Sequence, residues 1–142
     1  MNIKTEVYDQ VSELAFELVG ASSVDDTKLI WTLYNEIKSL CEQYETGDFD
    51  HPFQWETLAD FTTDDASSIE IYEKAFGLAR NMDLGEYMGS IKLALAERYS
   101  ELGLNVQAYD AVTEADTYAK NTDNMELRTE VSQFLLCQSN NT

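Results

Sequence analysis

Apolar residues recur at spacings of three and four along most of this chain, and this periodicity restricts the fold more than any other feature of the sequence. Near the start, for example, Val7, Val11, Leu14 and Leu18 fall on one face of a helix. Pro52 is the only proline, and runs that alternate apolar with polar residues, as half-buried strands do, are missing. The sequence therefore predicts an all-α fold.

Seven helices are expected, bounded by glycines and by residues that cap helix starts. The first is expected over residues 4–19 with Gly20 as its end, and the third begins near Pro52, because proline suits the first turn of a helix. Two kinds of signal mark the starts of other helices. One is the capping residue Asn105, and the other is a Ser or Asp that is followed three residues later by an acidic residue. The pairs are Ser23 with Asp26, Ser67 with Glu70, Asp83 with Glu86, and Asp123 with Glu126.

The length of the chain and its short connections indicate how these helices are organised. A chain of 142 residues can bury one substantial core, so we expect a single α-helical domain over 1–142. It comprises an N-terminal helical hairpin at 4–46, repeat-like hairpins at 52–121 and a C-terminal helix at 123–137. Connections of a few residues favour about seven antiparallel helices, either in a bundle or as stacked αα-hairpins.

The expected fifth and sixth helices carry a pattern that distinguishes these two architectures. Aligned with W-x-x-L-G-x-x-Y and A-x-x-x-F-x-x-A, the residues at the named positions are Lys92, Leu95, Ala96, Tyr99, Ala108, Val112 and Ala115. The pair resembles a tetratricopeptide repeat. Small residues such as Ala96 and Ala108 fit where the two helices of a hairpin cross closely. The departures are Lys92 in place of tryptophan and Lys120 in place of the terminating proline.

A second copy of this pattern lies upstream and matches less well. Its residues are Trp55, Leu58, Ala59, Ser68, Tyr72 and Ala75. Thr62 occupies the tyrosine position, and Ala75 lies forty residues before Ala115 instead of thirty-four. The resemblance implies a short array like that of tetratricopeptide repeats, whose first helices line a concave groove that binds peptides or proteins.

The charge of the chain indicates which partner such a groove accepts. There are 27 Asp and Glu against 9 Lys and Arg, a formal net charge of −18. Because a surface this negative repels phosphate backbones and anionic lipids, we expect a basic protein as partner, and neither nucleic acid nor a membrane. Acidity can also serve solubility alone, which is the competing explanation.

Many of the acidic residues are concentrated in one block. No Lys or Arg lies between Lys38 and Lys74, a stretch that contains ten acidic residues and several aromatic ones. We expect this block and the matched fifth helix to form the contact surface, with Trp31 or Phe53 as an exposed aromatic anchor. The predicted partner-binding residues are Glu56, Asp60, Asp64, Asp65, Glu97 and Glu101.

Catalytic and metal sites find less support in the sequence. Paired carboxylates such as Asp64 and Asp65 fall at expected helix starts, where they satisfy free backbone N–H groups. His51 is the only histidine, and a calcium-binding loop at Asp48 fails because Pro52 occupies a ligand position. We therefore expect no enzyme, no cofactor and no metal, with a site built from carboxylates alone as the open alternative.

The cysteines and the N-terminal residues bear on the cellular compartment. Cys41 and Cys137 lie far apart in helical patterns, which predicts two buried thiols rather than a disulfide. The first residues lack the basic and apolar segments of a signal peptide, and no run of about eighteen apolar residues occurs. We therefore expect a cytoplasmic protein.

Size, acidity and helical-repeat pattern together resemble the immunity proteins of bacterial toxin and immunity pairs. Such proteins bind a cognate toxin domain and block it, and many of these toxins are nucleases with basic substrate clefts. The resemblance implies an acidic immunity protein that neutralises a basic toxin domain by blocking its cleft. The alternatives are a helical-repeat peptide-binding adaptor or secretion chaperone, and an enzyme with a carboxylate-bound metal.

Overall fold

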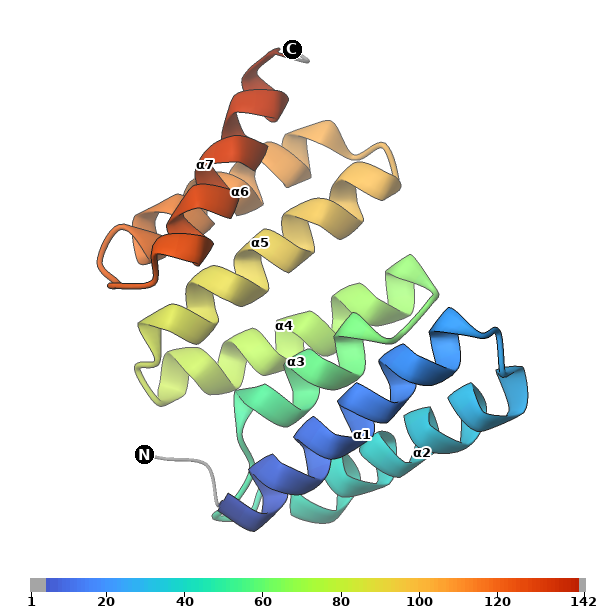
Figure 1. The fold of residues 1–142 in the computed structure, drawn as a ribbon. Coiled ribbons are helices and arrows are strands. Elements are labelled where there is room, and N and C mark those ends of the chain that lie inside the picture. Colours follow the sequence, from blue (N-terminus) through green and yellow to red (C-terminus); the bar gives the residue numbers. More distant parts are fainter. Residues whose placement is uncertain (1–4, 141–142) are drawn as a thin grey trace.

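The computed structural model describes residues 5–140, and this part of the chain consists of helices and their connections, with no strand. The helices are α1 (Thr5–Ser23), α2 (Thr27–Tyr44), α3 (Pro52–Asp60), α4 (Asp65–Asn81), α5 (Gly85–Glu101), α6 (Asn105–Ala119) and α7 (Met125–Asn140) (Figure 1). The predicted all-α fold with seven helices is confirmed for this range. The expected first helical residue, Lys4, lies outside it.

Each helix packs against the next one along the chain, and a second set of contacts connects alternate helices. α1 contacts α3, α3 contacts α5, and α5 contacts α7. Within residues 5–140, the backbones of α2 and α4 do not approach each other, nor do those of α4 and α6. The start of α1 and the end of α7 therefore lie at opposite ends of an elongated array (Figure 1).

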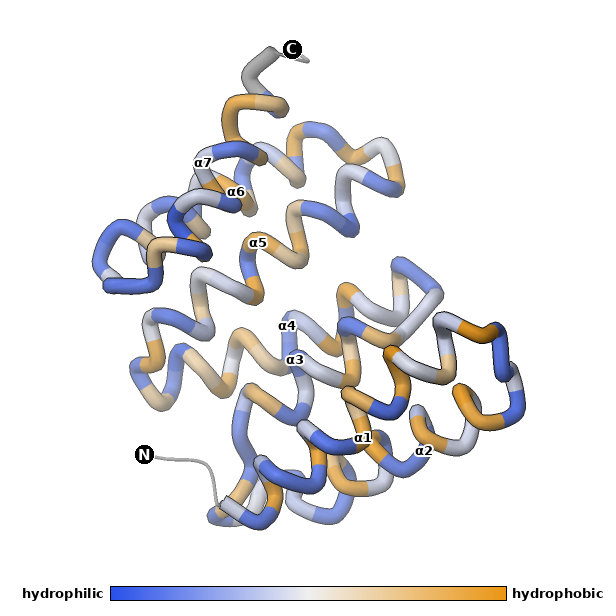
Figure 2. The backbone as a smooth tube through the Cα atoms, viewed as in Figure 1, coloured by the Kyte–Doolittle hydropathy of each residue, from blue (hydrophilic) through white to orange (hydrophobic). Residues whose placement is uncertain are grey.

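The core is one continuous cluster of buried side chains that extends from Leu18 in α1 to Val131 in α7. Hydrophobic and hydrophilic segments alternate along the helices, as the periodicity requires (Figure 2). The two small residues predicted for a helix crossing, Ala96 and Ala108, are completely buried. The other small residues at the repeat positions are completely buried as well: Ala59, Ser68, Ala75 and Ala115. Between α3 and α4 the approach is close enough for the Ser68 Oγ to donate to the carbonyl of Ala59 at 2.9 Å.

Three connections share one way of ending a helix. Asp25, Asp83 and Gly103 have φ values of 53°, 55° and 74°, in the left-handed region. The next residue in each case donates its backbone N–H to the carbonyl five residues earlier: Asp26 to Ala21 at 3.0 Å, Leu84 to Ala79 at 2.9 Å, and Leu104 to Tyr99 at 2.9 Å. This is the Schellman arrangement, which satisfies carbonyls of the last helical turn.

The first half of the chain corrects several expected helix ends. α1 does not stop at Gly20 but continues to Ser23, because the left-handed residue that ends it is Asp25. α2 is capped by Asp26 alone, whose side chain accepts from the Leu29 N–H at 3.2 Å. α3 does begin at Pro52, and the preceding His51 caps it by accepting from the Phe53 N–H at 3.0 Å.

The second half corrects further caps. α4 is capped by Asp64, which confirms the capping role predicted for this carboxylate, and not by Ser67. α7 is capped by Asn124 instead of Asp123, since the Asn124 Oδ1 accepts from the N–H of Leu127 at 2.9 Å. α5 and α6 have no side-chain cap, because the Schellman turn places an apolar residue, Leu84 or Leu104, at each start. Asp83 and Asn105 therefore do not act as the expected caps.

The two cysteines have different environments. Cys41 is buried, its Sγ donates to the carbonyl of Gln54 at 3.3 Å, and desolvation together with Asp50 raises its pKa to about 12. Cys137 is exposed, so the expectation of a second buried thiol was wrong; both thiols are free. Between residues 5 and 140, no helix is long and apolar enough to cross a membrane.

Candidate protein-binding site

Three helices that are separate in sequence enclose an acidic cleft. It has a volume of about 340 Å³ and lies where α3, α5 and the start of α7 meet. Within the described part of the chain, its lining contains four glutamates and no Lys or Arg. The lining residues are Phe53, Glu56, Glu86, Tyr87, Ser90, Asn124, Glu126, Leu127 and Glu130.

Glu56 is the most desolvated carboxylate of this cleft. It projects from α3, and its Oε2 accepts a hydrogen bond from the Ser90 Oγ of α5 at 2.6 Å. Burial, with a further contribution from the charge of Asp60, raises the pKa of Glu56 to about 7, although the bond from Ser90 acts in the opposite direction. The pKa of this carboxyl group therefore lies near neutrality.

Hydrogen bonds and ring contacts hold the rest of the lining in place. The Asn124 Nδ2 donates to the Glu86 Oε1 at 2.7 Å, which connects the start of α7 to the start of α5. The ring of Phe53 stacks on that of Tyr8 with centroids 4.7 Å apart. The ring of Tyr87 meets that of His51 edge to face at 5.2 Å. Desolvation, followed by the charge of Glu56, raises the pKa of Tyr87 to about 12.

A second hollow, of about 300 Å³, continues the acidic surface along α5 and α7. Glu130 lines both hollows, and Glu97 lies opposite it in the second one. Desolvation and the neighbouring charges of Glu130 and Asp60 raise the pKa of Glu97. We call these five glutamates of the two hollows the acidic face: Glu56, Glu86, Glu97, Glu126 and Glu130.

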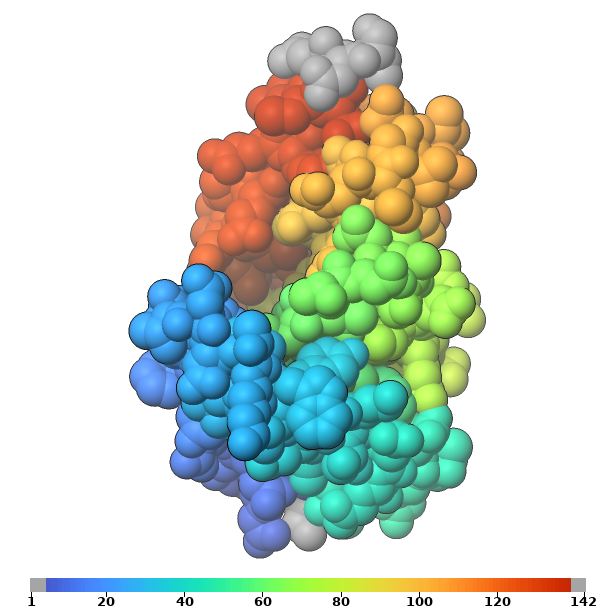
Figure 3. All heavy atoms as spheres, turned by 90° about the vertical axis from the view of Figure 1, so that its right-hand side faces the viewer, coloured from blue at the N-terminus to red at the C-terminus, as the bar shows by residue number. Residues whose placement is uncertain are grey.

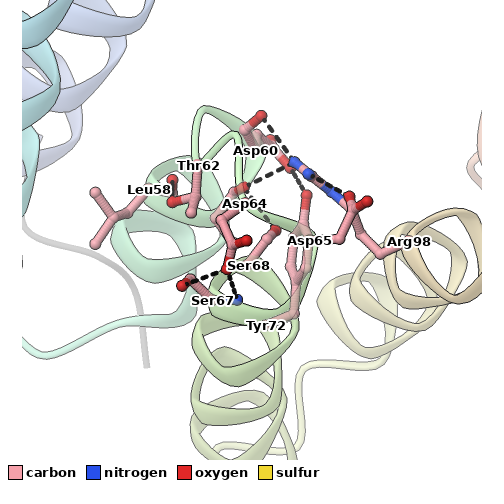
Figure 4. A network of polar contacts seen from close by, with 10 residues as sticks. Leu58, Asp60, Thr62, Asp64, Asp65, Ser67, Ser68, Tyr72 and Arg98 are labelled. Atoms are coloured by element: carbon pink, nitrogen blue, oxygen red, sulfur yellow. Dashed lines mark hydrogen bonds and ion pairs between the residues drawn. The ribbon is translucent and has the colours of Figure 1, made fainter. Parts of the chain in front are cut away.

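Next to this face, Arg98 of α5 organises a polar network at the α3–α4 connection (Figure 4). Its Nη1 donates to the Asp65 Oδ1 at 3.0 Å, and its Nη2 donates to the carbonyl of Ala59 at 3.2 Å. The Tyr72 hydroxyl donates to the Asp60 carboxylate. Asp60 as a residue is exposed, but desolvation of its carboxylate raises its pKa, against the effects of Tyr72 and Arg98.

The six predicted site residues fall into two groups. Glu56, Asp60 and Glu97 lie close enough for their charges to interact. The charge of Glu101, the last residue of α5, also contributes to the raised pKa of Glu97. The other two are engaged elsewhere: Asp64 accepts from the N–H of Ser67 at 2.9 Å as the cap of α4, and Asp65 is paired with Arg98.

Sequence reasoning missed the glutamates at the start of α5 and on α7. The local pattern places Glu86 in a capping pair with Asp83, and Glu126 in one with Asp123. The signal that could have found two of them is their spacing on α7. Glu126 and Glu130 are four residues apart, so they share one face of that helix.

The two predicted aromatic anchors differ in position. Trp31 is 69% exposed and lies on α2, away from the acidic face, whereas Phe53 is half-buried in the cleft. In the described part of the chain, no group of three or more His, Cys, Asp and Glu side chains is arranged to hold a metal ion. Comparisons with protein-family models, with curated proteins and with solved structures found no match to this chain.

Proposed function

We propose that this protein is a protein-binding module whose acidic face receives a basic surface of a partner protein. The observation that carries the proposal is the collection of carboxylates from α3, α5 and α7 around a cleft whose described lining contains no cation. Holding like charges together with partial desolvation costs free energy, as the raised pKa of Glu56 indicates. A cationic group from a partner offsets this cost, so the arrangement favours binding of a basic protein.

Helical-repeat architecture supports a groove of this kind. The row of contacts from α1 through α3 and α5 to α7 connects the helices that would be the first members of successive antiparallel hairpins. In both repeat-like hairpins, fully buried small residues occupy the crossing positions, with Ala59 and Ser68 in one and Ala96 and Ala108 in the other. On this proposal the acidic face is the concave face of a short array that resembles tetratricopeptide repeats.

The partner class that fits best is a basic toxin domain, which this protein neutralises as an immunity protein. The net charge of −18 speeds the encounter with a basic domain by electrostatic steering. Glutamate side chains placed in a basic substrate cleft, such as that of a nuclease, occupy the place of the phosphates and exclude the substrate. Size and charge support this class, in addition to the acidic face.

The second candidate is an adaptor or secretion chaperone that binds an extended basic peptide. It is favoured by the division of the acidic face into two small hollows, of about 340 Å³ and 300 Å³, along neighbouring helices. Such hollows suit individual side chains of an extended segment better than the surface of a folded domain. The two candidates differ in what remains bound after purification: one folded domain or many proteins that share a segment.

The test is capture from an extract of the source cell with the purified chain as bait, at about 0.05 M and 0.5 M NaCl. We expect one basic protein at near-equal stoichiometry, released by salt, whose own activity is inhibited by this chain. Several proteins with a common basic segment support the adaptor instead. Retention that does not depend on salt contradicts binding through the acidic face.

Matched charge reversals then locate the contact surface by isothermal titration calorimetry with the captured protein. Glu97→Lys with Glu130→Lys changes two exposed residues of the acidic face, and we expect the affinity to fall at least about tenfold. Glu13→Lys with Glu17→Lys makes the same change in net charge on exposed positions of α1. Equal losses in the two double variants mean that only net charge matters, which contradicts the proposed site.

A further inference from the structure

Another hollow lies away from the acidic face, between α2 and α4. It has a volume of about 750 Å³, and α3 forms its floor. Figure 3 shows the molecule from the side on which α2, in blue to cyan, and α4, in green, reach the surface. Most of the exposed lining is apolar and includes Ile30, Trp31, Phe61 and Ile71, whereas Trp55 and Leu58, which also line the groove, are buried.

This groove exists because its floor helix is short. α2 has 18 residues and α4 has 17, but α3 between them has only 9. The corresponding space between α4 and α6 is occupied: the rings of Phe76 and Tyr118 lie 6.0 Å apart, and the Lys92 Nζ lies 4.4 Å from the centroid of the Phe76 ring. The chain thus fills one of these two spaces and leaves the other open.

Trp31 on the α2 wall is the main exposed apolar group of the groove. Its side chain is 69% exposed, and within residues 5–140 its ring has no aromatic or cationic contact. A large rigid ring that is exposed beside an apolar groove gains most when a partner covers it, which is why Trp is enriched among residues that dominate interface energetics.

The charges at the rim determine the chemistry of the occupant. The charged lining residues are three carboxylates, from Glu42, Glu45 and Asp64, and two ammonium groups, from Lys38 and Lys74. Lys74 is paired with Glu45 and lies 3.9 Å from the centroid of the Trp55 ring, so it is engaged within the chain. The rim therefore keeps a small negative excess within a chain of net charge −18, which favours an occupant with basic flanks.

We propose that this groove binds an amphipathic helix of a partner protein, with an apolar stripe against Trp31 and Ile71 and with Lys or Arg beside the stripe. Along α2 the groove extends from Thr27 to Glu45, about 27 Å at 1.5 Å per residue, and along the α4 side from Asp64 to Lys74, about 15 Å. The longer wall matches a helix of about 18 residues, of which about ten lie between both walls. The inference rests on the proposed function only for the sign of the partner's charge; the site is a different one.

The test uses three synthetic 18-residue helical peptides and the intrinsic fluorescence of the chain. One peptide has a leucine stripe with lysine flanks, one the same stripe with glutamate flanks, and one a serine stripe with lysine flanks. The chain has two tryptophans, and both line the groove. We expect saturable binding of the first peptide with a blue shift of the tryptophan emission, and at least about tenfold weaker binding of the other two.

Substitutions then assign the binding to this groove. Calorimetry of Trp31→Ala is expected to show at least about tenfold weaker binding of the first peptide. Phe16→Ala, which changes an 80% exposed aromatic residue on α1, is expected to leave the affinity for this peptide unchanged. Glu97→Lys with Glu130→Lys also leaves it unchanged, so that failure of the groove and failure of the acidic face are distinguishable.

Three outcomes overturn the inference. Equal affinity for all three peptides means that the groove does not select an amphipathic basic helix. Full affinity in Trp31→Ala, or loss in the Glu97 and Glu130 double variant, places the peptide elsewhere. Dimerisation of the free chain in sedimentation experiments that Trp31→Ala abolishes means that a second copy, and not a partner helix, fills the groove.

Discussion

Glu56 of α3 accepts a hydrogen bond from Ser90 of α5 at 2.6 Å in the interior of the acidic cleft, where its pKa is raised from 4.5 to about 7 by desolvation and by Asp60. The bond fixes the carboxylate between two helices without supplying a positive charge. This pair therefore connects the architecture of the cleft to the dependence of folding on pH.

The stability of the protein is expected to fall as pH rises through the range set by Glu56. Its folded pKa is above the unfolded value, so between about 4.5 and 7 the folded chain keeps a proton that the unfolded chain releases. The contribution is present below pH 4.5 and is lost as pH approaches 7, and it amounts to at most about 3 kcal/mol.

Urea unfolding of wild type and Glu56→Gln at intervals from pH 4.5 to pH 8 measures this effect. The amide keeps an acceptor for Ser90 and cannot ionise. We therefore expect the stability of the variant relative to wild type to increase steadily as pH rises. Glu17→Gln on the exposed surface of α1 is the control, with a profile parallel to that of wild type. Parallel profiles for Glu56→Gln contradict the prediction.

Removal of the Arg98 side chain is expected to destabilise the fold by about 1–3 kcal/mol. Arg98→Ala breaks the ion pair with Asp65 and removes one of the two side-chain donors to the carbonyl of Ala59, the other being the Ser68 Oγ. The control is Arg128→Ala, which removes an exposed guanidinium whose contact is the sulfur of Met125. In chemical denaturation, the free energy of unfolding of the Arg128→Ala control should lie within about 0.5 kcal/mol of the wild-type value. Similar losses of stability in the two variants argue against the network.

Replacement of a small residue at a helix crossing by a larger one is expected to lower the free energy of unfolding by about 1–3 kcal/mol, because the packed crossing cannot accept extra volume. Ala96 in α5 is 0% exposed, so Ala96→Leu should lower the midpoint of thermal unfolding. Ala66→Leu adds the same atoms at an exposed position in the first turn of α4 and should change the midpoint little. A neutral Ala96→Leu indicates that the helices do not cross as closely as described.

Two glycine substitutions are expected to have opposite signs. Gly103 has a φ of 74°, so Gly103→Ala places a side chain in the left-handed region and should destabilise by about 1 kcal/mol. Gly20 lies inside α1, and an added Cβ meets no atom within 4 Å. Gly20→Ala should therefore stabilise by up to about 1 kcal/mol through helix propensity. Denaturant midpoints measure both; a destabilising Gly20→Ala contradicts a helix that runs through this position.

Local sequence pattern was sufficient for the helices themselves. The stripe of Leu95, Ala96 and Tyr99 followed by Ala108 and Val112 predicts two helices with small residues at their crossing, and the structure has α5 and α6 there with Ala96 and Ala108 fully buried. Periodicity is a property of one helix and of the solvent around it, so it can be read without knowing what lies opposite.

Local pattern was not sufficient for the helix ends. Asp83 matches a capping pair with Glu86 in spacing, but it takes the left-handed conformation that ends α4. An Asp can serve in either role, and the choice depends on whether the connection is tight enough for the Schellman bond from Leu84 to Ala79. The packing of α4 against α5 sets that length.

The membership of the acidic face was decided by tertiary structure alone. An acidic surface follows from the net charge of −18, but Asp64 and Asp65, which lie in the acidic block, are engaged as a helix cap and in an ion pair. Glu130 lies outside the block, and α7 brings it to Glu97 by packing back on α5. Charge is additive along a chain, whereas the distance between carboxylates on different helices depends on how those helices pack.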